Sequence, residues 1–206
     1  MSIKSNIEYI QKLKGRAAEI SGRQEEDVLL VAVTKLHDAN EINEAIDAGI
    51  TDIGENKVQE IVDKYDDVKP VRWHLIGHLQ RNKVKYIIDK VSMIHSVDSL
   101  KLAKEIDKRA KQHDLTMDIL VQVNSARDEN KFGITTEETE ELISQIAEEC
   151  SNLRIRGLMC IAPYEENVDD ARPYFAAVKK IYDKYKEDAY LEALCAVLIR
   201  GDIRTA

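Results

Sequence analysis

The amino-acid sequence predicts an α/β protein: a TIM-like (β/α) barrel with a leading N-terminal helix and without an eighth strand. Short apolar, β-rich runs alternate with longer segments of helical period along nearly the whole chain, which is typical of βα units around a parallel sheet. The first run continues into VTKLHDANE, without the glycines that a doubly wound fold places after its first strand. The barrel is therefore favoured over an open sheet.

The expected elements follow in chain order. A helix is expected over residues 6–20, ahead of the first strand. Strands are expected at residues 27–35, 51–56, 71–77, 92–98, 117–124, 153–160 and 191–199. Amphipathic helices are expected between and after them, at residues 39–50, 57–66, 79–89, 99–112, 136–151 and 168–187, because apolar residues recur there three or four positions apart.

Composition limits the class of protein. A chain of 206 residues with 44% apolar content fits one domain over residues 1–206. The net charge of −8 argues against a nucleic-acid partner, which needs a basic surface. No apolar run is long enough to span a bilayer, and the N-terminus has mixed charges, unlike a signal peptide. Three widely spaced cysteines suggest neither a disulfide framework nor a metal site, which fits the reducing cytoplasm. We also expect a monomer.

Polar residues collect where the expected strands end. The five that stand out are Lys35, Asn56, His74, Ser96 and Asn124, one for each of the first five strands. In barrels and open α/β sheets this edge is where ligands bind. The convergence predicts a binding site at the carboxyl edge of the sheet.

Lys35 ends the apolar run that forms the first expected strand. Alternation along a strand puts it on the same face as Val31 and Val33, where burial would lower its pKa and supply a neutral amine to attack an aldehyde. Alternatively, Lys35 lies just beyond the strand and reaches into water. The residue pattern leaves both interpretations open.

Two further candidates have structural alternatives. Asn56 follows Gly54 at a strand-to-helix turn, where it either caps the helix or contacts a ligand. His74 and His78 have the spacing of a metal pair, but that spacing makes one face only on a helix, and WHLIGH reads as a strand and a turn. We therefore expect no metal site.

Seven segments together resemble a known family. They are VAVTK ending at Lys35, IGEN ending at Asn56, WHLIGHLQRNK from Trp73 to Lys83, IHSVDS around Ser96, VQVN ending at Asn124, NKFGI from Asn130 to Ile134, and RGLMCIAP from Arg156 to Pro163. In this order they resemble the pyridoxal phosphate homeostasis proteins, which are related to the N-terminal barrel of alanine racemase. The resemblance extends from about residue 6 to residue 185.

The resemblance implies a single-domain barrel that binds pyridoxal 5′-phosphate through a Schiff base on Lys35. Asn56 would lie beside the ring substituents, and Met159 would be an apolar pocket residue. From their strand-end positions, His74 and Ser96 are also expected to bind the cofactor. The implied role is to buffer the cofactor and deliver it to apo-enzymes, without established catalysis. Two alternatives stay open: a barrel whose site has decayed and no longer binds, and an amino-acid racemase, which would need a second proton donor.

The C-terminal sequence departs from the family pattern. Family members carry serine and glycine donors for the cofactor phosphate in the last two strands, whereas LCAVLIRGDIRTA lacks them. Since GDIRTA resembles the family's next helix, we hypothesise a reading-frame slip over residues 195–200, which resequencing of the coding DNA would test. An incomplete barrel is expected to leave unpaired sheet edges and to bind phosphate less tightly.

Overall fold

The computed structural model describes residues 2–128, 131–163, 167–185 and 193–197. Seven parallel strands form one sheet: β1 (Ala32–Val33), β2 (Asp52–Glu55), β3 (Arg72–Leu75), β4 (Met93–Val97), β5 (Met117–Val123), β6 (Leu153–Ile161) and β7 (Ala193–Val197). The α-helices are α1 (Ile3–Ile20), α2 (Ala39–Asp47), α3 (Val58–Lys64), α4 (Leu100–Gln112), α5 (Thr139–Glu149) and α6 (Arg172–Tyr185). Short 3₁₀ helices are η1 (Glu25–Asp27), η2 (Arg81–Tyr86) and η3 (Val168–Ala171).

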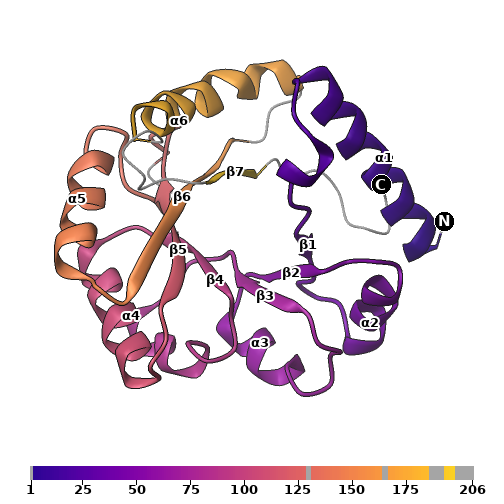
Figure 1. Cartoon of the computed structure of the whole chain (residues 1–206), viewed down its shortest axis with the longest axis horizontal. Coiled ribbons are helices and arrows are strands. Elements are labelled where there is room, and N and C mark those ends of the chain that lie inside the picture. Colours follow the sequence, from indigo (N-terminus) through magenta and orange to yellow (C-terminus); the bar gives the residue numbers. More distant parts are fainter. Residues whose placement is uncertain (1, 129–130, 164–166, 186–192, 198–206) are drawn as a thin grey trace.

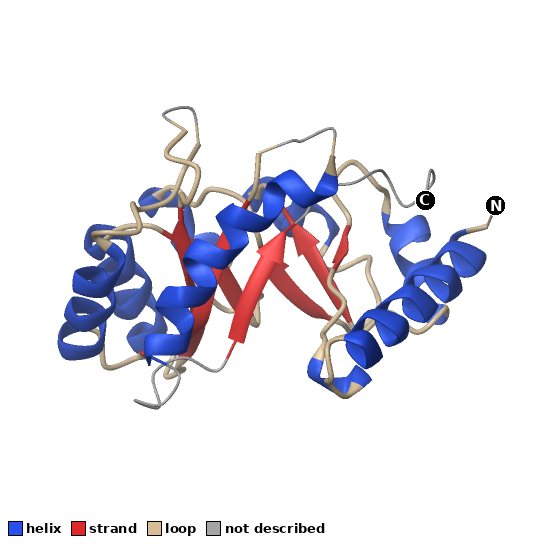
Figure 2. Cartoon of the chain, turned by 90° about the horizontal axis from the view of Figure 1, so that it is seen from above, coloured by secondary structure: helices blue, strands red, loops and turns tan. Residues whose placement is uncertain are grey.

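The strands neighbour one another in chain order, from β1 to β7, and all six pairings are parallel. A doubly wound sheet reverses its strand order part-way, whereas a barrel does not. The strands curve around a centre and the helices surround them (Figure 1), and in the view turned by 90° the strands lie between helices (Figure 2). The predicted TIM-like barrel is confirmed.

The ring of strands is not closed within the described part of the chain. β1 pairs with β2 and β7 pairs with β6, and no pairing joins β1 to β7 among the described residues. This break is where an eighth strand would lie in a closed barrel. Residues 198–206, which include the GDIRTA segment, lie outside the described residues.

The core fills the space between the sheet and its helices. Leu75, Ile94 and Ile119 occupy adjacent positions on β3, β4 and β5, and each is completely buried. Ile61 of α3 and Ile106 of α4 are equally buried and belong to the same cluster. Alternation along each strand then turns the intervening residues toward the barrel interior.

Several elements differ from the sequence prediction, and three of these differences have a bearing on the fold. The first strand was expected over residues 27–35, but among the described residues only Ala32–Val33 has strand pairing, with Ile53 and Gly54 of β2. The segment at 79–89 forms the 3₁₀ helix η2 rather than an α-helix, since a spacing of three or four residues fits both. The leading helix begins at Ile3, three residues early, where the side chain of Ser2 accepts a hydrogen bond from the Ser5 amide.

Candidate functional site

Lys35 lies in the turn that follows β1, at the carboxyl edge of the sheet. Its side chain is exposed, and it makes no hydrogen bond or ion pair with any residue that the structure describes. The prediction of a lysine on a buried strand face is therefore wrong, because β1 ends at Val33 and the chain has already turned. The alternative, a lysine just beyond the strand, is confirmed.

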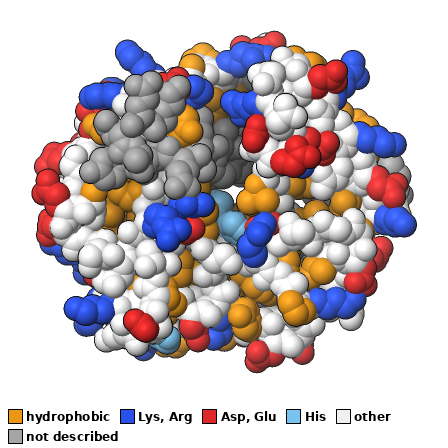
Figure 3. Space-filling model, viewed as in Figure 1, with side chains coloured by type: hydrophobic (Ala, Val, Ile, Leu, Met, Phe, Trp, Pro, Cys, Tyr) orange, Lys and Arg blue, Asp and Glu red, His pale blue; other side chains and the backbone are white. Residues whose placement is uncertain are grey.

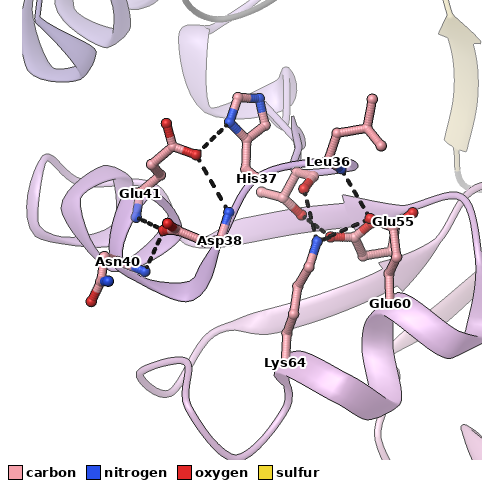
Figure 4. Close-up of polar contacts among 9 residues, drawn as sticks. Leu36, His37, Asp38, Asn40, Glu41, Glu55, Glu60 and Lys64 are labelled. Atoms are coloured by element: carbon pink, nitrogen blue, oxygen red, sulfur yellow. Dashed lines mark hydrogen bonds and ion pairs between the residues drawn. The ribbon is translucent and has the colours of Figure 1, made fainter.

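The residues on either side of Lys35 are held firmly (Figure 4). Thr34 is buried, and its Oγ1 donates to Oε1 of Glu55 on β2 over 2.8 Å. The backbone amide of Leu36 donates to Oε2 of Glu60 on α3 over 3.0 Å. Leu36 has a φ of 66°, a left-handed conformation that leucine rarely adopts without support from its surroundings.

Lys64, on the last turn of α3, joins these two anchors. Its Nζ donates to the Thr34 carbonyl over 3.2 Å, to Glu55 Oε1 over 2.9 Å and to Glu60 Oε2 over 3.0 Å. Burial alone would lower the pKa of Lys64, but the two carboxylates outweigh it and raise that pKa. We name Thr34, Glu55, Glu60 and Lys64 the anchor network.

The ends of β2 and β3 approach each other closely beside this turn. Asn56 is half-buried, and its side chain makes no hydrogen bond with any described residue. The N-cap of α3 is Lys57, without a side-chain bond, so the interpretation of Asn56 as a helix cap is not supported. A Cβ on Gly77 would lie 2.2 Å from the Asn56 carbonyl oxygen, so only glycine fits there.

His74 lies within β3, below the carboxyl edge, and both of its ring nitrogens are engaged. Nε2 lies 2.9 Å from Oδ1 of Asp52, and Nδ1 lies 2.8 Å from Nε2 of His95. All three side chains are buried, and Arg72 binds the Asp52 carboxylate through two nitrogens. Histidine atoms are visible in the hollow at the centre of the molecule (Figure 3).

The charges in this cluster follow from burial and pairing. Burial would raise the pKa of Asp52, but hydrogen bonds from Arg72, Thr51 and His74 outweigh it and lower that pKa to about 2. Burial lowers the pKa of His74 despite the nearby Asp52 carboxylate. Burial, and secondarily the charge of His74, lower the pKa of His95 to about 3. The two imidazoles are therefore neutral near pH 7, beside a charged carboxylate.

Ser96 and Met159 are buried on β4 and β6. Ser96 is 0% exposed, and its Oγ has no hydrogen-bond partner among the described residues. A buried hydroxyl without a partner is costly, and such groups often contact a ligand or a water. Met159 is 1% exposed and pairs with Gln122 of β5.

The loop after β5 is built around Asn124. Its Nδ2 donates to the carbonyls of Asp128 and Lys131. Gly133 has a φ of 118°, and a Cβ at this position would lie 2.8 Å from the backbone nitrogen of Asn124. Phe132 of this loop stacks on His78, with ring centroids 3.8 Å apart. The described residues contain no group of three or more acidic, histidine or cysteine side chains that could hold a metal ion. Asn130 lies outside the described residues.

Sequence reasoning found the strand-end residues but missed the anchor network and the Asp52–His74–His95 cluster. Glu55 precedes Asn56 within the segment TDIGEN, and an acidic residue inside an expected strand was the available signal. Lys64 lies on a helix that reads as solvated, so nothing in the sequence marks it.

Comparison with known proteins identifies the family. The family model of the alanine racemase N-terminal domain matches residues 9–197. A pyridoxal phosphate homeostasis protein of Aquifex aeolicus is 40% identical to this chain, and the match covers 88% of the chain and 78% of the relative. This chain belongs to the pyridoxal phosphate homeostasis protein family. Another member, from Escherichia coli, is 37% identical over 81% of this chain and 73% of its own length.

Solved structures agree with membership of the pyridoxal phosphate homeostasis proteins. PipY of Synechococcus elongatus, solved with PLP bound, superposes with a TM-score of 0.73 at 29% identity, covering 88% of this chain and 86% of PipY. An alanine racemase of Clostridium difficile gives a TM-score of 0.76 at 16% identity, covering 95% of this chain and 50% of the racemase. The racemase shares the fold. No helix in the described part of the chain is long and apolar enough to cross a membrane.

Proposed function

We propose that this chain binds pyridoxal 5′-phosphate as a Schiff base on Lys35, buffers it in the cytoplasm and delivers it to apo-enzymes. The observation that carries the proposal is the Lys35 amine, which is exposed at the carboxyl edge of the sheet and engaged by no described residue. The family name of its relatives and the PLP-bound PipY structure support the choice of ligand.

The residues present fit the cofactor. Pyridoxal 5′-phosphate supplies an aldehyde carbon, with which a lysine amine can form a covalent bond. Lys35 would hold that end, and the unengaged Asn56 amide and the partnerless Ser96 hydroxyl would bind polar substituents of the ring. Met159 would provide an apolar wall. The stretch that corresponds to the family's phosphate-binding strand ends, residues 194–206, lies outside the described residues from 198 onward.

His74 has a more indirect role in this proposal. Because Asp52 and His95 occupy both of its ring nitrogens, His74 would contact the cofactor through the ring face or edge rather than by a hydrogen bond. The two neutral imidazoles would shape the floor of the site and keep an uncharged surface beneath the cofactor ring.

The decisive experiment is spectroscopic. Protein loaded with pyridoxal 5′-phosphate should show the absorbance band of a lysine adduct, borohydride should remove that band, and peptide mapping of the reduced protein should find the modification on Lys35. Lys35→Ala should abolish the band. Lys57→Ala, which removes another exposed lysine from the same edge of the sheet, should leave it intact. A band that survives in Lys35→Ala would refute the assignment.

The same preparation separates the alternatives. A fluorescence titration in which added pyridoxal 5′-phosphate fails to bind would favour a decayed site. Racemisation of alanine that depends on Lys35 would show an enzyme, whereas we propose binding without turnover. Transfer of the cofactor to an apo-transaminase faster than its release into a solution scavenger would support directed delivery, and equal rates would limit the role to buffering.

A further inference from the structure

We propose that Lys64, acting with Glu55 and Glu60, positions Lys35 by fixing the turn on both sides of it. The inference rests on the proposed function, in which Lys35 holds pyridoxal 5′-phosphate. None of these three residues contacts the Lys35 side chain, so their role is one of positioning.

The side before Lys35 is fixed twice. Thr34 donates its hydroxyl to Glu55 over 2.8 Å, while its backbone nitrogen donates to the Gly54 carbonyl over 3.0 Å. The Thr34 carbonyl accepts from Lys64 over 3.2 Å. Every polar group of Thr34 thus has a partner on β2 or α3, which leaves this residue little freedom to rotate.

The side after Lys35 is held by two hydrogen bonds. The His37 amide donates to the Thr34 carbonyl over 3.1 Å and closes the turn, and the Leu36 amide donates to a charged group. The Leu36 amide donates to Glu60 over 3.0 Å, and the same carboxylate oxygen accepts from Lys64 over 3.0 Å. Leu36 is 84% exposed, so packing of its side chain does not hold its left-handed backbone in place. The hydrogen bond to Glu60 therefore supports the strained conformation together with the turn bond from the His37 amide to the Thr34 carbonyl.

Lys64 is suited to unite the two sides because its ammonium has three hydrogens and all three are used. The side chains of Lys64, Glu55 and Glu60 are 15%, 0% and 19% exposed, so the charges are shielded from water and from salt. An apolar side chain at this position would leave all three acceptors without this donor. The backbone of Lys35 is consequently held in place while its amine stays free, which is a preorganised binding group.

Loss of the network should lower the fraction of molecules with the turn in its binding conformation, and cofactor affinity falls by that same fraction. We expect Lys64→Met and Glu60→Ala to bind pyridoxal 5′-phosphate about tenfold more weakly, while Glu60→Gln, which keeps an acceptor oxygen for the Leu36 amide, stays nearer to wild type. Lys104→Met is the matched control, because it removes an exposed lysine that pairs with Glu149 on the outer helices.

A second readout needs no cofactor. In cofactor-free protein, amide hydrogen exchange at Leu36 should be faster in Lys64→Met and Glu60→Ala than in wild type, and near wild type in Glu60→Gln and Lys104→Met. Urea unfolding of each variant checks that the barrel is intact; if Lys64→Met fails to fold, the two Glu60 variants decide the matter.

The two proposals fail in distinguishable ways. If the wild-type chain does not bind pyridoxal 5′-phosphate, the proposed function falls, while the exchange rates still report whether the network holds the turn. If binding occurs but affinity and exchange at Leu36 are the same in Glu60→Ala, Glu60→Gln and wild type, the positioning role is overturned.

Discussion

The Nε2 atom of His74 lies 2.9 Å from Oδ1 of Asp52, inside the ring of strands and shielded from water. Because the second ring nitrogen of His74 faces His95, a charged carboxylate and two neutral imidazoles form one hydrogen-bonded row. Protonation of any member would disturb the others, so the cluster makes the stability of the barrel depend on pH.

The free energy of unfolding should fall in two stages as the pH decreases. Because folding lowers the pKa of His74 and His95, the unfolded chain binds protons at these residues at a higher pH than the folded chain does. The free energy of unfolding that this difference contributes is present above about pH 6.5 and is lost below it. The pKa of Asp52 is lowered from 3.8 to about 2, so its share, about 2 kcal/mol, is present above about pH 4 and is lost as the pH falls toward 2.

Urea unfolding between about pH 7 and about pH 2 measures both stages. A His95→Leu variant should lose stability less steeply near pH 6 than wild type, because it lacks a buried imidazole. Curves of equal slope for the two proteins would contradict this account.

Lys35→Ala should leave the stability of the cofactor-free barrel almost unchanged. The side chain is exposed and contacts no described partner, so the free energy of unfolding should change by less than about 0.5 kcal/mol. Chemical denaturation checks this directly. A large loss would mean that Lys35 supports the fold, and loss of the cofactor band in this variant could then no longer be assigned to the missing amine.

Ser96→Ala should separate ligand binding from folding. Removing a buried hydroxyl that lacks a partner should be neutral or slightly stabilising for the cofactor-free protein, yet weaken cofactor binding if Ser96 Oγ serves as a ligand contact. Thr139→Val is the contrast, because Oγ1 of the buried Thr139 donates to the Thr135 carbonyl over 2.7 Å, and its loss should cost about 1 kcal/mol. A stability loss of similar size in both variants would show that Ser96 is a structural hydroxyl.

Gly77→Ala should destabilise the barrel where β2 and β3 meet. The new methyl group would lie 2.2 Å from the Asn56 carbonyl oxygen, so the backbone must move at a cost of about 1–3 kcal/mol. Gly15→Ala on α1 is the control, since its Cβ meets only a flexible Glu25 side chain and alanine favours the helix by about 1 kcal/mol. Thermal unfolding should shift downward for the first variant and upward for the second.

The sequence predicted the barrel because its apolar runs carry the two periodicities of strands and helices. It also located the strand-end residues Lys35, Asn56, Ser96 and Asn124, since these directly follow or end such runs. The pairing of Lys64 with Thr34 spans 30 residues and depends on how α3 packs beside β1, which no local pattern encodes. The buried position of Asp52 was equally hidden, because an acid at the start of a strand usually reads as solvated.

β1 is joined to the sheet by only two residue pairs, Ala32 with Ile53 and Val33 with Gly54, so this end of the sheet should open more often than the long ladder between β5 and β6. A ligand bound to Lys35 would oppose that opening, because a molecule that binds only the closed form raises the population of the closed form. The rate at which proteases cleave the segment around β1 would then decrease as the cofactor concentration rises. In a cell, this would couple the lifetime of the protein to the supply of the molecule it carries.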